Sequence, residues 1–98
     1  MNARILVDRA KIAEFCRRNH IRWLAFFGSV LRDDFRPGSD VAVLVEFEPG
    51  HTPGLAFITM QNELSELLGR KVDLVSKKGL KPIIRDEVLA TAKVIYAE

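Results

Sequence analysis

Cysteine is almost absent from this sequence, since Cys16 is the only one among 98 residues. A single cysteine cannot form an internal disulfide, which excludes a fold held together by disulfide bonds. Cys16 lies in a segment whose apolar residues recur at helical spacing, and an unpaired cysteine is most often a small buried apolar residue. We therefore predict that it packs in the core.

The sequence also lacks long apolar runs. The longest wholly apolar stretches are WLAFF and VAVLV, whereas a membrane-spanning helix needs about 20 residues. No apolar stretch near the N-terminus is followed by a small-residue cleavage site, so we expect no signal peptide. These absences predict a cytoplasmic protein without a membrane partner.

The sequence also lacks a large excess of charge of either sign. The formal net charge is +2, and DNA-binding proteins usually concentrate a much stronger basic stripe. Direct DNA binding is therefore not expected. With 48% apolar and 29% charged residues, the composition is ordinary for a globular protein. The length suits a single domain over residues 1–98.

Three segments have the pattern of full helices. Residues 8–19 start at Asp8, a plausible N-cap, and carry apolar residues at helical spacing. Residues 55–68 place leucines on one side and are followed by Gly69, where a left-handed residue is expected. A third helix is predicted from about residue 82, a proline, to about residue 92.

Strands are predicted between these helices. Residues 21–28 and 71–76 are short apolar segments, and residues 40–48 alternate between two faces. A short helix is expected over 30–35, and the VIYA segment (94–97) either adds an edge strand or extends the packing. The order αβαβαβα predicts an α/β (α+β) two-layer domain with helices flanking a small mixed sheet.

Acidic residues occur in or beside two of the predicted strands. Residues i and i+2 of a strand point the same way, so positions 40 and 42 share a face. Asp73 points away from its apolar neighbours and can approach Asp40 if the two strands are adjacent. Clustered carboxylates need a compensating cation, and Mg²⁺ prefers such oxygen ligands together with substrate phosphates.

A glycine and a serine precede this cluster. Gly28 allows close approach of the backbone to a phosphate, and Ser29 at a helix start supplies a hydroxyl and N–H groups. Together with the acids, these residues predict a site that holds a nucleoside triphosphate between a helix start and a metal ion.

The string FGSVLRDDFRPGSDVAVLVEF followed by VDLVS resembles the minimal nucleotidyltransferases, small members of the DNA polymerase β-like nucleotidyltransferase superfamily. That family has Gly-Ser, about ten residues, Asp-x-Asp on a strand, and a third Asp on a later strand. Gly28, Ser29, Asp40 and Asp73 match this pattern, as does the basic residue Arg32. The resemblance covers nearly the whole chain and implies the nucleotidyltransferase fold.

One position departs from the family pattern. The second Asp of Asp-x-Asp falls at residue 42, which is Ala42. Its methyl group supplies no oxygen to a metal, and a two-metal transfer clamps the attacking and leaving oxygens together. Loss of this ligand predicts weakened or absent chemistry. Both an engineered inactivation and a natural loss fit the sequence.

Each candidate has an ordinary structural alternative. Gly28 and Ser29 can simply end a strand and cap a helix, and Asp40 can be a turn acid. Asp73 can be an exposed acid of an edge strand, and Arg32 a solvated helix residue.

The two histidines do not indicate a site. His20 and His51 are not placed with metal-ligand spacing in the sequence, so we predict both to be surface residues.

The resemblance implies transfer of AMP from ATP to an acceptor hydroxyl. Relatives commonly act as antitoxins of a helical HEPN toxin, by adenylylating a tyrosine on it or by binding it. The implied roles are Mg²⁺ binding by Asp40 and Asp73, help from Asp73 in deprotonating the acceptor, and triphosphate binding by Gly28, Ser29 and Arg32.

Two other functions stay open. Ala42 favours a non-catalytic module that neutralises its partner by complex formation alone. A small-molecule nucleotidyltransferase is a third possibility, although such enzymes usually carry additional domains for the acceptor.

Overall fold

The computed structural model describes residues 7–28, 40–51 and 53–98. In these ranges the elements follow in the order α1 (Arg9–Arg18), β1 (Ile21–Phe27), β2 (Val41–Phe47), α2 (Ala56–Leu68), β3 (Val72–Ser76), the short 3₁₀ helix η2 (Lys77–Gly79), α3 (Pro82–Thr91) and β4 (Lys93–Ala97). The long predicted helices and strands are confirmed, with ends that differ by at most one residue. The short helix predicted over 30–35 lies outside the described residues.

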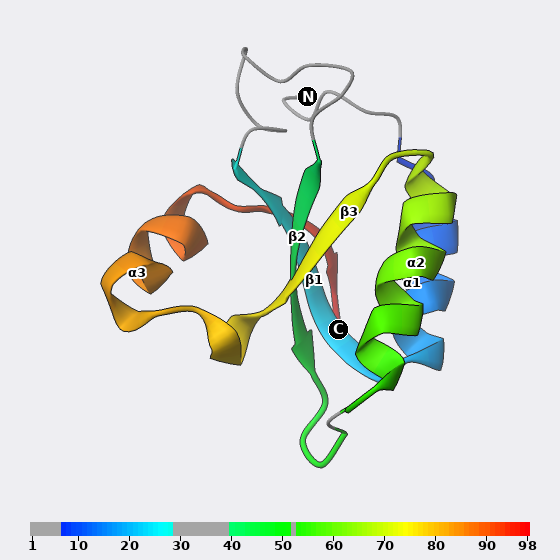
Figure 1. Ribbon diagram of the computed structural model, residues 1–98, viewed down its shortest axis with the longest axis horizontal. Coiled ribbons are helices and arrows are strands. Elements are labelled where there is room, and N and C mark those ends of the chain that lie inside the picture. The colour runs from blue at the N-terminus through cyan, green and yellow to red at the C-terminus, as the bar shows by residue number, and fades with distance from the viewer. Residues whose placement is uncertain (1–6, 29–39, 52) are drawn as a thin grey trace.

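The strands form one mixed sheet in the order β3-β2-β1-β4 (Figure 1). β1 pairs antiparallel with both β2 and β4, whereas β2 and β3 run parallel. The last segment therefore forms an edge strand, one of the two alternatives that its sequence left open. The helices and the mixed sheet confirm the predicted α+β class.

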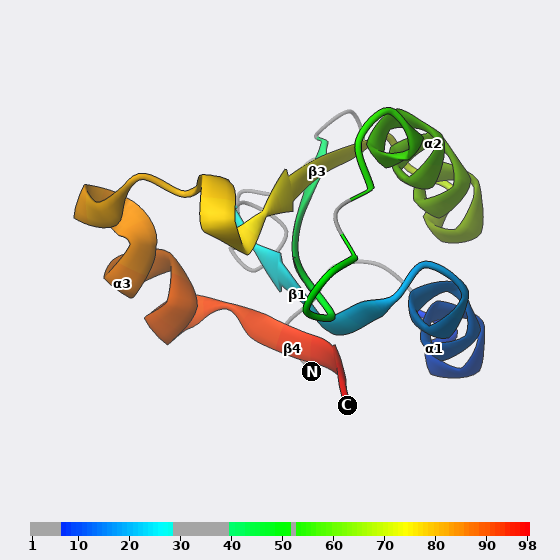
Figure 2. The same cartoon turned by 90° about the horizontal axis from the view of Figure 1, so that it is seen from below.

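The helices lie on both sides of this sheet. α1 and α2 lie side by side against one face, and α3 lies on the opposite side (Figures 1 and 2). Each of the ten residues of α3 is at least partly exposed. The main core therefore lies on the side of the sheet that α1 and α2 cover. None of the helices within the described ranges has the length and apolar character needed to cross a membrane.

The core lies between the sheet and the pair α1 and α2. Alternation in β2 turns Val41, Val43 and Val45 toward these helices. The buried cluster consists of Ile12, Phe15, Cys16, Ile21, Leu24, Phe26, Val41, Val43, Val45, Met60, Leu64, Leu68, Val72, Leu74 and Ile95. Burial of this set is the main favourable term that holds the sheet against the two helices.

Local sequence signals explain where α1 and α2 begin and end. The Asp8 side chain accepts a hydrogen bond from the backbone N–H of Lys11 and so caps α1, as predicted. Gly69 follows α2 with φ +65°, the left-handed conformation that its sequence position predicted. Arg18 of α1 forms an ion pair with Glu63 of α2.

Cys16 is fully buried in α1, which confirms its predicted place in the core. Burial raises the pKa of its thiol to about 12, because the apolar surroundings disfavour the thiolate. The side chain therefore stays neutral and acts as a small apolar residue.

Candidate functional site

Three positions of the candidate site meet at one end of the sheet. Residue 42 in β2 is the register partner of Phe27 on one side and of Asp73 on the other. Gly28 follows Phe27 directly, and a Cβ atom added to Gly28 would lie 3.7 Å from the Cβ atom of Ala42. Position 42 therefore lies between the Gly28 backbone and the Asp73 side chain.

The faces of the strands decide where these side chains point. Val72 and Leu74 are buried in the core, so Asp73 between them points to the other face and is exposed. Ala42 lies between the buried Val41 and Val43, so its side chain also points to the other face. Both side chains therefore lie on the sheet face opposite to α1 and α2, the side on which α3 lies (Figure 2).

Asp40 stands immediately before β2 and is exposed. It is two residues from Ala42, which corresponds to about 7 Å along an extended chain. Asp40 and Asp73 are therefore the carboxylates that the described residues supply around position 42. The two predicted site residues Ser29 and Arg32 lie outside the described residues.

Side chains of α2 fix the position of Asp73. The backbone N–H of Val72 donates to Oγ of Ser65 at 3.0 Å, and that of Leu74 donates to Oε1 of Gln61 at 2.9 Å. These two hydrogen bonds occupy the backbone on both sides of Asp73, at an edge strand whose outer N–H groups would otherwise lack a partner. β3 is therefore held by β2 along one edge and by α2 along the other.

Gly28 has a backbone conformation that other residues rarely adopt. Its φ is +76°, in the left-handed region where a side chain would be strained. The absence of a Cβ atom also leaves open the space directly beside residue 42. Both features suit a position where the backbone must approach a bound group closely.

The donor set fits a magnesium ion only in part. Mg²⁺ is usually held by one or two protein carboxylates together with substrate phosphates. Asp40 and Asp73 can supply two such carboxylates. At the position between Asp73 and Gly28, however, the methyl group of Ala42 provides no ligand atom.

The model of the family "Polymerase beta, Nucleotidyltransferase" matches residues 10–98. The chain belongs to this nucleotidyltransferase family. The match spans every described helix and strand except the first residue of α1, so family membership applies to the fold as a whole.

Relatives place the chain more closely within the family. It is 40% identical over 84 residues to the protein adenylyltransferase MntA of Thermococcus cleftensis, which covers 85% of this chain and 81% of the relative. A solved structure assigned to the minimal nucleotidyltransferases is also 40% identical, with a TM-score of 0.71 and coverage of 86% of this chain and 85% of the other. The predicted resemblance is thereby confirmed.

A more distant structure supports the fold. It contains an MNT antitoxin in complex with a tri-AMPylated HEPN toxin of Shewanella oneidensis. The chain of that structure that matches is 21% identical in sequence to the present chain, with a TM-score of 0.67. The match covers 92% of the present chain and 70% of the other. At that identity the likeness concerns the fold alone.

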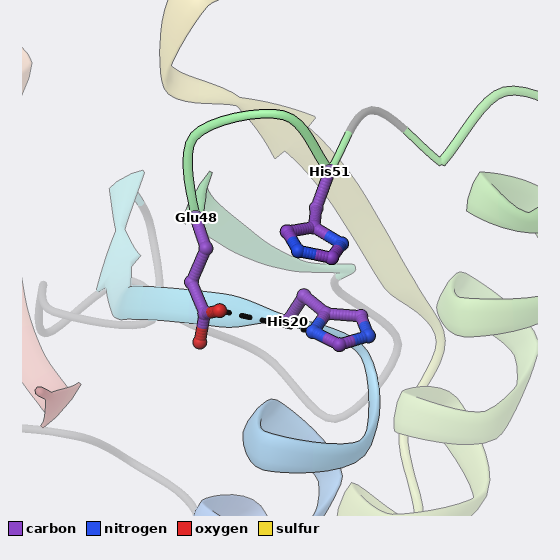
Figure 3. A group of neighbouring side chains, drawn as sticks. All are labelled: His20, Glu48 and His51. Carbon is purple, nitrogen blue, oxygen red and sulfur yellow. Dashed lines mark ion pairs between the residues drawn. The ribbon is translucent and has the colours of Figure 1, made fainter.

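A second polar group was missed by the sequence analysis. His20, Glu48 and His51 come together at the other end of β1 and β2, with potential metal-binding atoms within 4.8 Å of one another (Figure 3). Both histidines are exposed, as predicted. Their spacing in the sequence did not indicate this group, because it forms only where the antiparallel pairing of β1 and β2 brings position 20 next to position 48.

Proposed function

We propose that this protein is a nucleotidyltransferase that transfers AMP from ATP to a hydroxyl of a protein partner, and that Ala42 weakens or abolishes the transfer. The observation that carries the proposal is the place of residue 42 between Gly28 and Asp73. The similarity to protein adenylyltransferase MntA supports AMP as the transferred group. The acceptor is a tyrosine of a HEPN-type toxin, for which this chain is the antitoxin.

Each residue has a defined task in this proposal. Asp40 and Asp73 hold Mg²⁺, and Gly28 with Ser29 and Arg32 binds the triphosphate. When bound, the metal ion neutralises charge on the phosphate oxygens during transfer. Asp73 also takes up the proton of the acceptor hydroxyl, since it is exposed on the face that a partner can reach.

The face beside the site has a surface suited to a partner. α3 lies on the same side of the sheet as Ala42 and Asp73 (Figure 2) and leaves Ile83 87% exposed and Ile84 44% exposed. Burial of these two apolar side chains under a partner would be favourable. A toxin that covers α3 brings its own surface close to the site.

Ala42 also supports a second function, binding without transfer. An interface needs about 800 Å² from each partner, and that area depends little on one carboxylate in the site. The loss of a metal ligand falls instead on the chemical step. In this alternative the chain neutralises the toxin by complex formation alone.

Intact-mass spectrometry of the toxin distinguishes the two functions. The chain and the Ala42→Asp variant are each incubated with a HEPN-type partner, ATP and Mg²⁺. We expect both to form the complex, and the partner to gain one or more AMP masses only with the Ala42→Asp variant. Ala42→Asp combined with Asp73→Asn is the matched control and should leave the partner unmodified.

Two outcomes contradict parts of this proposal. Equal modification by the chain and by Ala42→Asp would show that residue 42 is dispensable for transfer. A partner that binds both forms and stays unmodified would support the binding function and remove the transferase function.

A further inference from the structure

His20, Glu48 and His51 come from two parts of the chain. His20 follows α1 and directly precedes β1, Glu48 follows β2, and His51 lies at the start of the connection to α2. Figure 3 shows the two imidazole rings one above the other, with the Glu48 carboxylate beside them. The group lies about 20 Å along β2 from residue 42, at the opposite end of the strand.

Backbone hydrogen bonds hold the three residues together. The N–H of Glu48 donates to the carbonyl oxygen of His20 at 2.8 Å, and the N–H of His51 donates to the carbonyl oxygen of Glu48 at 3.0 Å. Glu48 and His51 are thus the ends of a tight turn, whose Gly50 has φ +83°. The backbone positions of the three residues therefore follow from the fold.

His20 has an unusual backbone conformation. Its φ is +58°, and in the described part of the chain it is the one residue other than glycine with a positive φ. A left-handed conformation costs a residue with a side chain about 1–2 kcal/mol. Such strain occurs preferentially at ligand-binding and catalytic positions. His20 also directly follows the C-cap of α1, a place where left-handed residues are common.

The side chains offer two imidazoles and one carboxylate. The ring centroids of His20 and His51 are 3.8 Å apart with an angle of 13° between the planes. Nδ1 of His20 lies 3.7 Å from Oε1 of Glu48. One ligand atom from each of the three residues lies within 4.8 Å of the other two.

We propose that His20, Glu48 and His51 form a binding site for a divalent transition-metal ion of the zinc class. Imidazole nitrogens suit Zn²⁺, Cu²⁺ and Ni²⁺, whereas Mg²⁺ takes oxygen ligands. Three protein ligands with one open position are the usual arrangement of a zinc site that also binds water or another ligand.

Binding requires one change in the side chains. The lone pair of an imidazole lies in the plane of its ring, so two stacked rings direct their lone pairs side by side and not toward one point. For them to converge, one ring has to rotate about its side-chain torsions. This rotation breaks the stack between the two rings, and both side chains are exposed enough to move.

The chain contains no competing set of soft ligands. His20 and His51 are its only histidines, and Cys16 is its only cysteine. The thiol of Cys16 is fully buried and its pKa is raised to about 12, so it supplies no thiolate. Any metal binding by this chain that depends on imidazole must therefore occur at this site.

The site also borders a cavity of the described residues. This cavity has a volume of about 590 Å³, and Glu48 and His51 belong to its lining together with Phe47 and Phe57. A bound ion thus forms part of the cavity wall and joins the turn to the start of β1. This inference does not depend on the transferase function.

The test uses the full chain without a histidine tag. Isothermal titration with Zn²⁺ measures affinity, and the visible absorption of Co²⁺ reports the geometry of the ligands. Three variants remove one ligand each: His20→Asn, which tolerates the left-handed backbone, Glu48→Gln and His51→Gln. Asp73→Asn is the matched control, because it removes a carboxylate from the other end of the sheet.

We expect one equivalent of Zn²⁺ to bind and to remain bound in excess Mg²⁺. Loss of a group outside the ligand set of a metal already costs about 10–100-fold in affinity, so each ligand variant should lose at least about tenfold. Asp73→Asn should bind Zn²⁺ as the unchanged chain does. Both imidazoles should shift together in the NMR spectrum when Zn²⁺ is added.

Several results would overturn the site. These are no Zn²⁺ binding by the unchanged chain, equal binding by the unchanged chain and both histidine variants, or a loss of binding in Asp73→Asn alone. The fold of each variant is checked by its amide NMR spectrum. His51→Gln lies in an exposed turn, so it keeps the test valid if His20→Asn fails to fold.

Discussion

At residue 28, both the backbone conformation and the proposed phosphate binding require a glycine. Its φ of +76° strains any side chain, and its missing Cβ atom leaves space beside residue 42. In the Ala42→Asp background, Gly28→Ala should reduce the free energy of unfolding by about 1–2 kcal/mol. It should also weaken ATP binding in the presence of Mg²⁺, as measured by calorimetry, because the new methyl group occupies the space proposed for the phosphates.

The matched control for this prediction is Gly69→Ala. Gly69 has a similar φ of +65°, and a Cβ atom there would meet nothing within 4 Å. It should lower stability by a comparable amount and leave ATP affinity unchanged. If Gly28→Ala also left the affinity unchanged, the assignment of the phosphates to Gly28 would be wrong.

At the scale of elements, β3 is held by α2 as well as by its partner strand. Gln61 and Ser65 accept the N–H groups of Leu74 and Val72, the residues on either side of Asp73. Gln61→Leu leaves the N–H of Leu74 without its partner, which should cost about 1–3 kcal/mol of stability. In the Ala42→Asp form it should also slow AMP transfer, because Asp73 is then less well positioned.

Gln61→Glu tests the cause of this effect, since it keeps an oxygen at the same place. Chemical denaturation gives the stability and intact-mass spectrometry the rate of transfer. Gln61→Glu should lie much closer to the unchanged chain than Gln61→Leu in both. If Gln61→Glu lost as much stability as Gln61→Leu, the hydrogen bond to Leu74 would not be the cause of the loss.

The elements themselves were predictable because local signals agreed with the packing. Asp8, Gly69 and the alternation in residues 40–48 each mark a feature that the structure contains. The sequence predicted the approach of Asp73 to Asp40 only on the condition that their strands are adjacent, because a sequence does not state which strands are neighbours. The pairing of Ala42 with Asp73 emerged from the structure. The group at His20 escaped prediction for the same reason, because it depends on strand register and on an unusual φ.

At the scale of the whole molecule, the two ends of one sheet carry different ligand chemistry. One end offers carboxylates and an open glycine backbone, and the other offers two imidazoles and a carboxylate beside a cavity. Residues 42 and 48 of the same extended segment are separated by about 20 Å. Oxygen-seeking and nitrogen-seeking ions are therefore expected to bind this chain at separate places.

The stability of the whole protein should depend on the number of carboxylates at the end of the sheet that contains residue 42 and Asp73. Ala42→Asp adds a carboxylate directly across from Asp73, and like charges at paired positions of a sheet repel by up to about 1 kcal/mol. Without Mg²⁺ we expect the melting temperature of Ala42→Asp to fall by up to about 4–8 °C. The drop should be smaller at high salt, which screens exposed charges.

Mg²⁺ should reverse this loss, because a bound ion stabilises the folded state and compensates both carboxylates. The chain with Ala42 should gain much less from Mg²⁺, because Asp40 and Asp73 without a carboxylate at residue 42 hold the ion more weakly. Ala42→Asn is the matched control, since it has the size of Asp without the charge and should respond to Mg²⁺ and salt no more than the chain with Ala42 does. Circular dichroism melts of the three forms decide the matter. If Ala42→Asn melted as low as Ala42→Asp, the cause would be side-chain volume at residue 42, and the carboxylate pair with Asp73 would have no part in it.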